Sequence, residues 1–122
     1  MPLALFEKDG ILPIVYSGAV TGKDLDNWPA SLKEAEARTG RVPNRLVDLT
    51  RVTRLELTFT DMLVLAERRR GLRFKNAFKC ALVAYEPVTT GFAQMYEALN
   101  DHPQTTIEVF PDRDTALRWV GE

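Results

Sequence analysis

RLVDLTRVTRLELTFTDM, residues 45–62, is the most informative segment of the chain, because a strand that ends at a carboxylate is followed by a capped helix. Its first apolar run, residues 46–49, is short and apolar on both faces, which is typical of a central strand in a covered sheet. The run contains the carboxylate Asp48, and Thr58 or Thr60 is placed to cap the helix that follows. A junction of this kind, from strand to helix, is where an α/β domain usually binds its ligands.

Apolar residues in the rest of the chain alternate between the spacing of a strand and the spacing of a helix. We expect strands at residues 3–6, 11–17, 80–85 and 105–110, with the first two joined as a hairpin through Asp9 and Gly10. Pro13 has no N–H group to donate, so a bulge or an open side is expected near the start of the second strand. Strands joined through helices by short loops form a mostly parallel sheet, so the predicted fold class is α/β.

Each expected helix has an apolar stripe and a recognisable start or stop. Thr21 and Asp24 form a capping box for the first helix, in which Pro29 is expected to cause a kink near Asn27. Asp112 is placed to cap the last helix. The stripes are Leu25, Trp28, Leu32 and Ala35; Met62, Leu65, Ala66 and Arg69; Phe92, Met95, Tyr96 and Leu99; and Ala116, Leu117 and Val120.

Length and composition fit a single globular domain over residues 1–122. The chain is 45% hydrophobic and 27% charged, and no biased tract predicts disorder. We find no secretory signal and no apolar run long enough to span a membrane, and the one cysteine, Cys80, cannot form an intramolecular disulfide. These features predict a cytoplasmic protein.

Charge is distributed unevenly, although the formal net charge is only −1. Residues 38–79 hold eleven Lys or Arg and four Asp or Glu, a balance of +7, which leaves −8 for the rest of the chain. A dipolar surface of this kind favours partner binding or self-association. The basic residues from Arg68 to Arg73 could bind an anion, but cations in the last turn are also what a helix C-terminus favours. We therefore expect no nucleic-acid partner.

Every candidate for catalysis or cofactor binding has a simpler structural explanation. Residues 17–24 lie between a strand and a helix, as a phosphate-binding loop would, but their glycines are one residue too close. Asp24 also replaces the hydroxyl residue that would hold magnesium. Cys80 begins an apolar strand, His102 stands alone at a helix end, and Asp48 is better placed to cap a turn than to act as a base. No catalytic residue, cofactor or metal is expected.

A family resemblance extends over nearly the whole chain. It is carried by Gly18, Val20, Thr21, Asp24, residues 46–48, residues 81–83, Val109, Phe110, Ala116, Leu117 and Trp119. At these positions the sequence resembles the SpoIIAA-like branch of the STAS superfamily, whose small bacterial members are also described as related to the lipid-binding CRAL-TRIO domain. The resemblance implies a mostly parallel sheet of about five strands with an antiparallel first strand, about four helices, and no catalytic machinery.

The resemblance also implies a regulatory role. Anti-sigma-factor antagonists of the superfamily are phosphorylated on a serine of an Asp-Ser-Ser-Gly-like signature at a helix start. The equivalent residues here, 57–61, read LTFTD. Because the serine and the glycine are missing, Thr58 and Thr60 are only conditional stand-ins for the phosphorylated residue.

Three hypotheses about function result. The first is a non-enzymatic STAS-like module that binds a protein partner at a recognition edge formed by Asp48, Arg51, Thr58, Thr60 and Asp61. The second is a carrier of a small apolar or lipid-like ligand, in a pocket between the sheet and the helix that holds Phe92, Met95 and Tyr96. The third is an enzyme that uses Asp48 or His102. A homodimer is also consistent with so small a domain.

Overall fold

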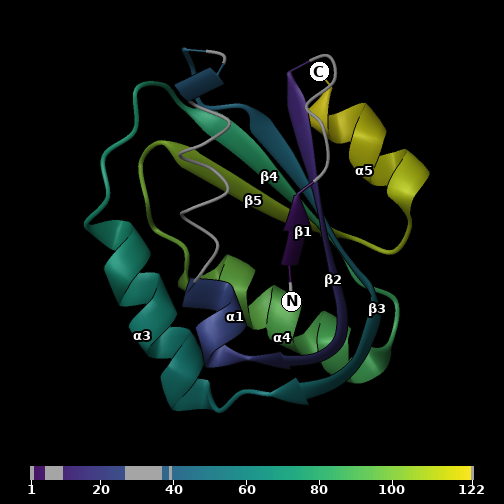
Figure 1. Ribbon diagram of the computed structural model, residues 1–122. Coiled ribbons are helices and arrows are strands. Elements are labelled where there is room, and N and C mark those ends of the chain that lie inside the picture. The colour runs from purple at the N-terminus through teal and green to yellow at the C-terminus, as the bar shows by residue number, and fades with distance from the viewer. Residues whose placement is uncertain (1, 5–9, 27–36, 39, 122) are drawn as a thin grey trace.

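The computed structural model of the chain describes residues 2–4, 10–26, 37–38 and 40–121, which form a twisted sheet with helices packed on it (Figure 1). The strands are β1 Pro2–Ala4, β2 Ile11–Thr21, β3 Asn44–Glu56, β4 Phe78–Val83 and β5 Thr105–Phe110. They lie side by side in sequence order. Strands β2 to β5 are parallel, and the short β1 pairs with β2 in the antiparallel direction.

Helices follow the strands as the sequence predicts. They are α1 Gly22–Asp26, α3 Phe59–Arg70, α4 Pro87–Leu99 and α5 Arg113–Val120. Thr58, not Thr60, caps α3: its hydroxyl oxygen accepts from the Asp61 N–H at 3.1 Å, and the Asp61 carboxylate accepts from the Thr58 N–H at 2.9 Å. The predicted caps by Thr21 with Asp24 and by Asp112 are also present. The kink predicted at Pro29 lies outside the described residues.

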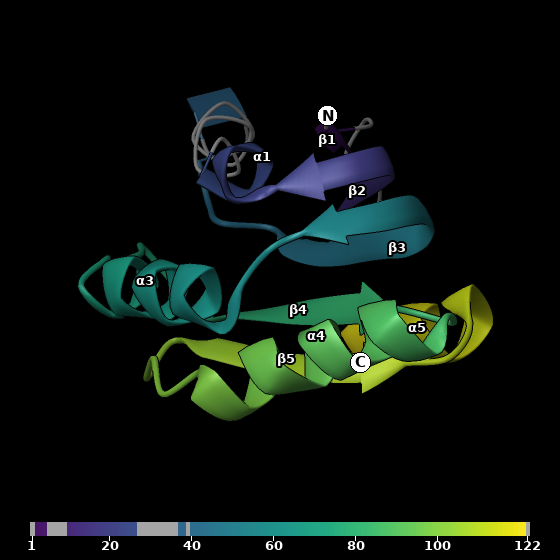
Figure 2. The ribbon, with the colours of Figure 1, turned by 90° about the horizontal axis from the view of Figure 1, so that it is seen from below.

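The two faces of the sheet are covered by different helices (Figure 2). On one face, Val47, Cys80 and Leu82 pack in a core with the inner sides of α1, α3 and α4. On the other face, Leu46 and Ala81 pack with residues of α5 in a smaller second core. Consecutive residues of the central strands therefore point to opposite cores, which explains why residues 46–49 and 80–83 have no polar side.

Strand β3 is much longer than the predicted strand of residues 46–49. Two bulges interrupt its apolar alternation, which is why the sequence pattern does not reveal its second half. Thirteen residues of β3 lie opposite eleven of β2, and the register shifts between Val15 and Ser17 and again between Gly18 and Ala19. The two extra residues of β3 are Thr50 and Thr53, both exposed. Bulges bend a strand and increase its twist, so β3 curves strongly along its length.

Of the two possibilities predicted near Pro13, a bulge or an open side, the bulge is not found in the pairing with β3. Pro13 pairs in regular register with Leu46. The Gly10 carbonyl accepts from the Asn44 N–H. In a parallel pair only every second residue directs its backbone groups toward the neighbouring strand, so Gly10 and Leu12 direct theirs toward β3, whereas Pro13 does not. Its missing N–H group therefore takes no bond away from the ladder with β3.

The sheet splits where β3 and β4 part. Their pairing ends at Asp48 and Val83, after which β4 leads into α4 while β3 continues to Glu56 paired with β2 alone. The second halves of β2 and β3 thus form a two-stranded ribbon that curves toward α1 and the start of α3 (Figure 1). The ribbon turns Val20, Val52 and Leu55 inward and its polar residues outward.

An alanine substitution at Gly18 tests the backbone conformation at the second bulge. Its φ is +67°, a left-handed value that costs residues with a Cβ atom about 1 kcal/mol or more, so we expect Gly18→Ala to destabilise the protein by about that amount. A Cβ atom at Gly18 or Gly91 would meet no atom within 4 Å, so neither substitution causes a clash. Gly91 lies inside α4, where alanine should stabilise by about 0.5–1 kcal/mol. Urea unfolding of Gly18→Ala and Gly91→Ala measures whether the first lowers and the second raises the free energy of unfolding. Equal effects of the two substitutions would contradict the left-handed conformation at Gly18.

Candidate functional site

The split in the sheet leaves an apolar pocket beneath the curved ribbon. Its volume is about 50 Å³, it is partly open to the surface, and its wall has no exposed polar surface. The wall is formed by Tyr16, Val20, Leu25, Val47, Leu49, Leu55, Leu57, Met62, Leu65, Leu82, Thr89, Phe92, Ala93 and Tyr96. These residues come from β2, β3, β4, α1, α3 and α4, and from the turn that leads into α3, so the pocket lies at the carboxyl end of the central strands, where ligands of open α/β sheets bind.

The three residues predicted to line a ligand pocket lie on α4 near this apolar pocket. Phe92 and Tyr96 are part of the wall, whereas Met95 packs against the same core without reaching the pocket. The helical stripe identifies α4 correctly, but it does not show which members of the stripe face the pocket. The contribution of β3 to the wall, Leu49 and Leu55, depends on the bulges and is missing from the sequence prediction.

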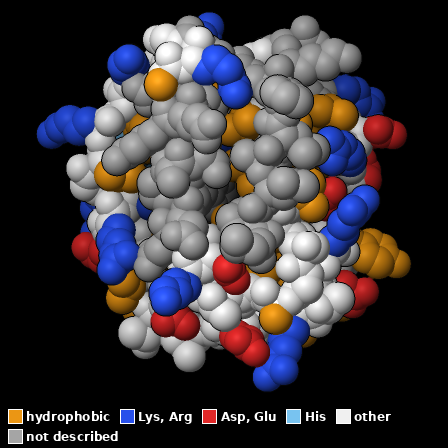
Figure 3. Space-filling model, in the orientation of Figure 1, with side chains coloured by type: hydrophobic (Ala, Val, Ile, Leu, Met, Phe, Trp, Pro, Cys, Tyr) orange, Lys and Arg blue, Asp and Glu red, His pale blue; other side chains and the backbone are white. Residues whose placement is uncertain are grey.

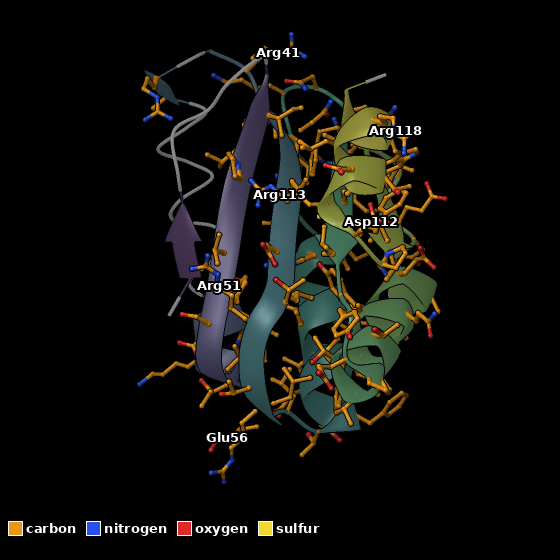
Figure 4. All side chains as sticks on the ribbon, turned by 90° about the vertical axis from the view of Figure 1, so that its right-hand side faces the viewer. Arg41, Arg51, Glu56, Asp112, Arg113 and Arg118 are labelled. Carbon is orange, nitrogen blue, oxygen red and sulfur yellow. The ribbon has the colours of Figure 1, made fainter. Side chains whose placement is uncertain are left out.

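The residues predicted to form one recognition edge lie in two separate places. Asp48 is in the middle of β3 on the α5 side, where its carboxylate accepts from the Thr50 N–H at 2.8 Å and faces Arg113 at 3.4 Å. Figure 4 shows Arg113 reaching from α5 across β3, and Arg51 farther along the strand on the outer side of the ribbon. Thr58 and Asp61 lie beyond the end of β3 and bind each other in the capping box of α3. Thr60 is exposed in the first turn of that helix.

Helix α3 carries apolar side chains on both of its faces. Met62, Leu65 and Ala66 are buried against the sheet. Outside this buried face, Phe59 is 55% exposed and Leu63 38%, and we call these two residues the α3 apolar surface. Val64, 47% exposed, lies about 100° around the helix from Leu63 and lines a separate cavity beside α1. Sequence reasoning missed it because it followed the buried stripe alone, although the spacing of four between Phe59 and Leu63 places them on one face.

Basic side chains are dispersed and locally paired. On the face shown in Figure 3, described basic and acidic side chains are interspersed, and neither sign gathers into one patch. Arg70 Nε lies 2.8 Å from Asp101 Oδ1 and its Nη1 lies 2.7 Å from Glu67 Oε1. The positive charge concentrated in residues 38–79 of the sequence therefore does not form one basic patch on the face shown.

A second, polar cavity of about 20 Å³ lies toward the other end of the same helical layer. We call it the arginine cavity, because Arg45 and Arg69 both line it. The other lining residues are Phe74, Phe78, Cys80, Tyr96, Asn100, His102, Thr105 and Ile107. Tyr96 is the residue that this cavity shares with the apolar pocket.

His102 is buried beside this cavity with both ring nitrogens engaged. Nδ1 accepts from the Gln104 N–H at 3.0 Å, so Nε2 carries the proton and donates to the Leu72 carbonyl at 2.6 Å. His102 precedes β5, whereas Asp48 lies beside the carboxyl end of β4, so the structure does not bring the two candidate catalytic residues together. Among the described residues, no group of three or more His, Cys, Asp and Glu side chains is arranged to hold a metal.

Cys80 should be an unreactive thiol in the native protein. Burial raises its pKa to about 11, and Arg45 and Arg69 offset part of that increase. We expect a disulfide reagent at pH 8 to modify the native protein at least about 100-fold more slowly than the denatured one.

The folded state keeps the thiol proton to higher pH than the unfolded state, so stability should fall as pH rises from about 9 to 11. Cys80→Ala should reduce that slope without removing it, because burial also raises the pKa values of Tyr16 and Tyr96; an unchanged slope would contradict a contribution from Cys80.

Comparisons with known proteins identify a fold. No protein-family model matches the sequence, and a search of curated proteins finds no match. Among solved structures, the chain is similar to an uncharacterised protein of the DUF3478 family with a SpoIIAA-like fold from Shewanella loihica PV-4. The TM-score is 0.63 and the sequence identity 19%, over 98% of this chain and 93% of that one. No helix in the described part of the chain is long and apolar enough to cross a membrane.

Proposed function

We propose that this chain, which has the predicted SpoIIAA-like fold, is a non-enzymatic module that binds a protein partner through the first half of α3. The observation that carries the proposal is the α3 apolar surface. A helix that packs on a sheet needs one apolar face, and α3 has a second one, with Phe59 more than half exposed. Large exposed apolar residues that gather on one element mark interaction sites.

The composition of this surface suits a transient interface. Full burial of a Phe or Leu side chain contributes about 1.5–3 kcal/mol, so two partly exposed ones supply a useful fraction of a binding free energy. Glu67 is exposed one turn after Leu63, which places a charged residue at the edge of the apolar surface.

The capping box makes Thr58 a poor phosphorylation switch. Its hydroxyl oxygen and the Asp61 carboxylate hold the first turn of α3 together, and a phosphoryl group on Thr58 would place two negative charges side by side. We therefore propose that the partner recognises the unmodified helix. Thr60, exposed and outside the box, is the one of the two threonines that could accept a phosphoryl group without breaking the cap.

Site-specific photo-crosslinking in cells tests the proposal. A crosslinking amino acid at Phe59 should capture the same partner as one at Leu63, and a probe at Leu117 on α5 should not capture it. Leu117 is a matched control because it is also an exposed leucine-sized residue on a helix, at 38% exposure. Capture of the same species with equal yield at all three positions, or at none of them, would overturn the proposal.

A second candidate function, the carriage of a small apolar ligand, is favoured by the wholly apolar wall of the pocket. The pocket volume is about 50 Å³, whereas an engineered cavity that binds benzene has a volume of about 150 Å³. A lipid-sized ligand would thus require α3 and α4 to move apart. This comparison is why we rank the protein-interaction function first.

A variant that fills the apolar pocket distinguishes the carrier function from the protein-interaction function. Ala93 lies on the pocket wall, and Ala93→Val adds two methyl groups there, so we expect stabilisation of about 0.5–1 kcal/mol. Ala98→Val is the matched control, since Ala98 is exposed on the same helix and should lose about 0.5 kcal/mol of helix propensity. Thermal unfolding under xenon pressure measures both stability and pocket occupancy. A wild-type shift under xenon that Ala93→Val abolishes would support an accessible pocket; no wild-type shift would count against the carrier.

A further inference from the structure

Strand β5 forms one edge of the sheet. It pairs with β4 alone, and no other strand lies beyond it in the part of the chain that the structure describes (Figure 2). An edge strand has one row of backbone N–H and C=O groups that no neighbouring strand binds, and such a row is a template for pairing with another chain. The contacts of this row therefore decide whether β5 is available to a second molecule.

Every second residue of β5 directs its backbone groups away from the sheet. The Phe78 N–H of β4 donates to the Gln104 carbonyl, so the even-numbered residues, which are in step with Gln104, direct their groups toward β4. The outward set is Thr105, Ile107 and Val109. Contacts at these three residues are the ones that cover the edge or leave it open.

The end of α4 binds two of these outward groups. The Glu97 carboxylate accepts from the Val109 N–H at 3.2 Å, and the Asn100 side-chain N–H donates to the Thr105 carbonyl at 3.0 Å. One side chain thus supplies an acceptor and the other a donor, as the backbone of a neighbouring strand would. Residues 97–100 therefore cover the edge of β5.

The edge of β5 is complementary to itself. If β5 strands of two copies paired in the antiparallel direction about a two-fold axis at Ile107, the Val109 N–H of each copy would donate to the Thr105 carbonyl of the other. Thr106 would lie opposite Glu108, so no two like charges would face each other. The atoms that a second copy would bind are thus the same two atoms that the end of α4 binds.

We propose that the end of α4 is an autoinhibitory cover of the β5 edge, and that loss of its contacts lets two copies of the chain pair along β5. A second copy is the occupant because the antiparallel register satisfies both the hydrogen bonds and the charges. Glu97 is the contact to remove, since Asn100 also ends α4 and accepts from the His102 N–H. The cover does not involve the α3 apolar surface, so this proposal does not rest on the proposed function.

Sedimentation of three variants tests the cover. Glu97→Ala removes the acceptor and introduces a good helix former, so the variant should fold and should self-associate at least about ten-fold more tightly than the wild type. Glu97→Gln removes the charge but keeps an acceptor oxygen, so it should behave as the wild type. Gln94→Ala, at an exposed position one turn earlier on α4, is the matched control and should leave self-association unchanged.

Disulfide crosslinking identifies the surface through which copies associate. Thr106→Cys and Glu108→Cys, each combined with Glu97→Ala, place thiols at exposed positions that lie opposite each other in the antiparallel register, within reach of a disulfide. Oxidation of a mixture of the two proteins should give more linked heterodimer than either protein gives homodimer. The proposal is overturned if Glu97→Ala remains monomeric, if Glu97→Gln associates as tightly as Glu97→Ala, or if the mixture gives no excess of heterodimer.

Discussion

Truncation of Tyr96 to alanine should lower the free energy of unfolding by about 3–5 kcal/mol, the largest stability effect that we expect of any variant considered for this protein. Tyr96 is 8% exposed and is part of the walls of both the apolar pocket and the arginine cavity. Removal of its ring would join the two cavities into one space that apolar side chains cannot fill. It would also remove the aromatic partition between the apolar side chains of the pocket and the guanidinium group of Arg45.

The matched control for this variant is Tyr96→Phe, which keeps the ring and removes only the hydroxyl group. We expect it to cost about 1 kcal/mol or less, because the partition between the cavities remains. Urea unfolding of the three proteins measures both differences. If Tyr96→Phe cost as much as Tyr96→Ala, the hydroxyl group, and not the ring, would be the stabilising part, and our description of the partition would be wrong.

The residues of β3 show how far the sequence predicts the fold and where it fails. The order of strands and helices, the cap at Asp112 and the SpoIIAA-like fold are predicted correctly, and Thr58 is the cap of the two threonines left open. The length of β3 is not predicted, because its inward apolar residues are Val47, Leu49, Val52 and Leu55, separated by two, three and three positions. Each spacing of three contains a bulge, and a strand with two bulges matches neither the period of a strand nor that of a helix.

The same bulges explain why the candidate site could be predicted only in part. A pocket on α4 follows from an apolar stripe, which is a local property of the sequence. The curvature that brings Leu55 over that stripe depends on the pairing of β3 with β2, between residues more than thirty positions apart. Arg45 is a comparable case: it is counted among the basic residues of a surface segment, and only the packing of Phe78 and Ile107 around it shows that it is buried.

Partner binding should be lost when the α3 apolar surface is made acidic. We expect the double variant Phe59→Glu with Leu63→Glu to lower the affinity for the crosslinked partner at least about 100-fold, since truncation of central interface residues commonly costs 2 kcal/mol or more each. The fold should tolerate the change. Both side chains are exposed, and acidic residues in or near the first turn interact favourably with the helix dipole, so the free energy of unfolding should change by less than about 0.5 kcal/mol.

Two controls make the result specific to this surface. Leu117→Glu adds a carboxylate at an equally exposed position on α5 and should leave the affinity unchanged. Ala93→Val fills the apolar pocket from inside and should also leave it unchanged, because the partner contacts the outer side of α3. Calorimetric titration of the four proteins measures the affinities. If Ala93→Val abolished binding while the double variant retained it, the pocket would be the functional site and the carrier hypothesis would replace the interaction module.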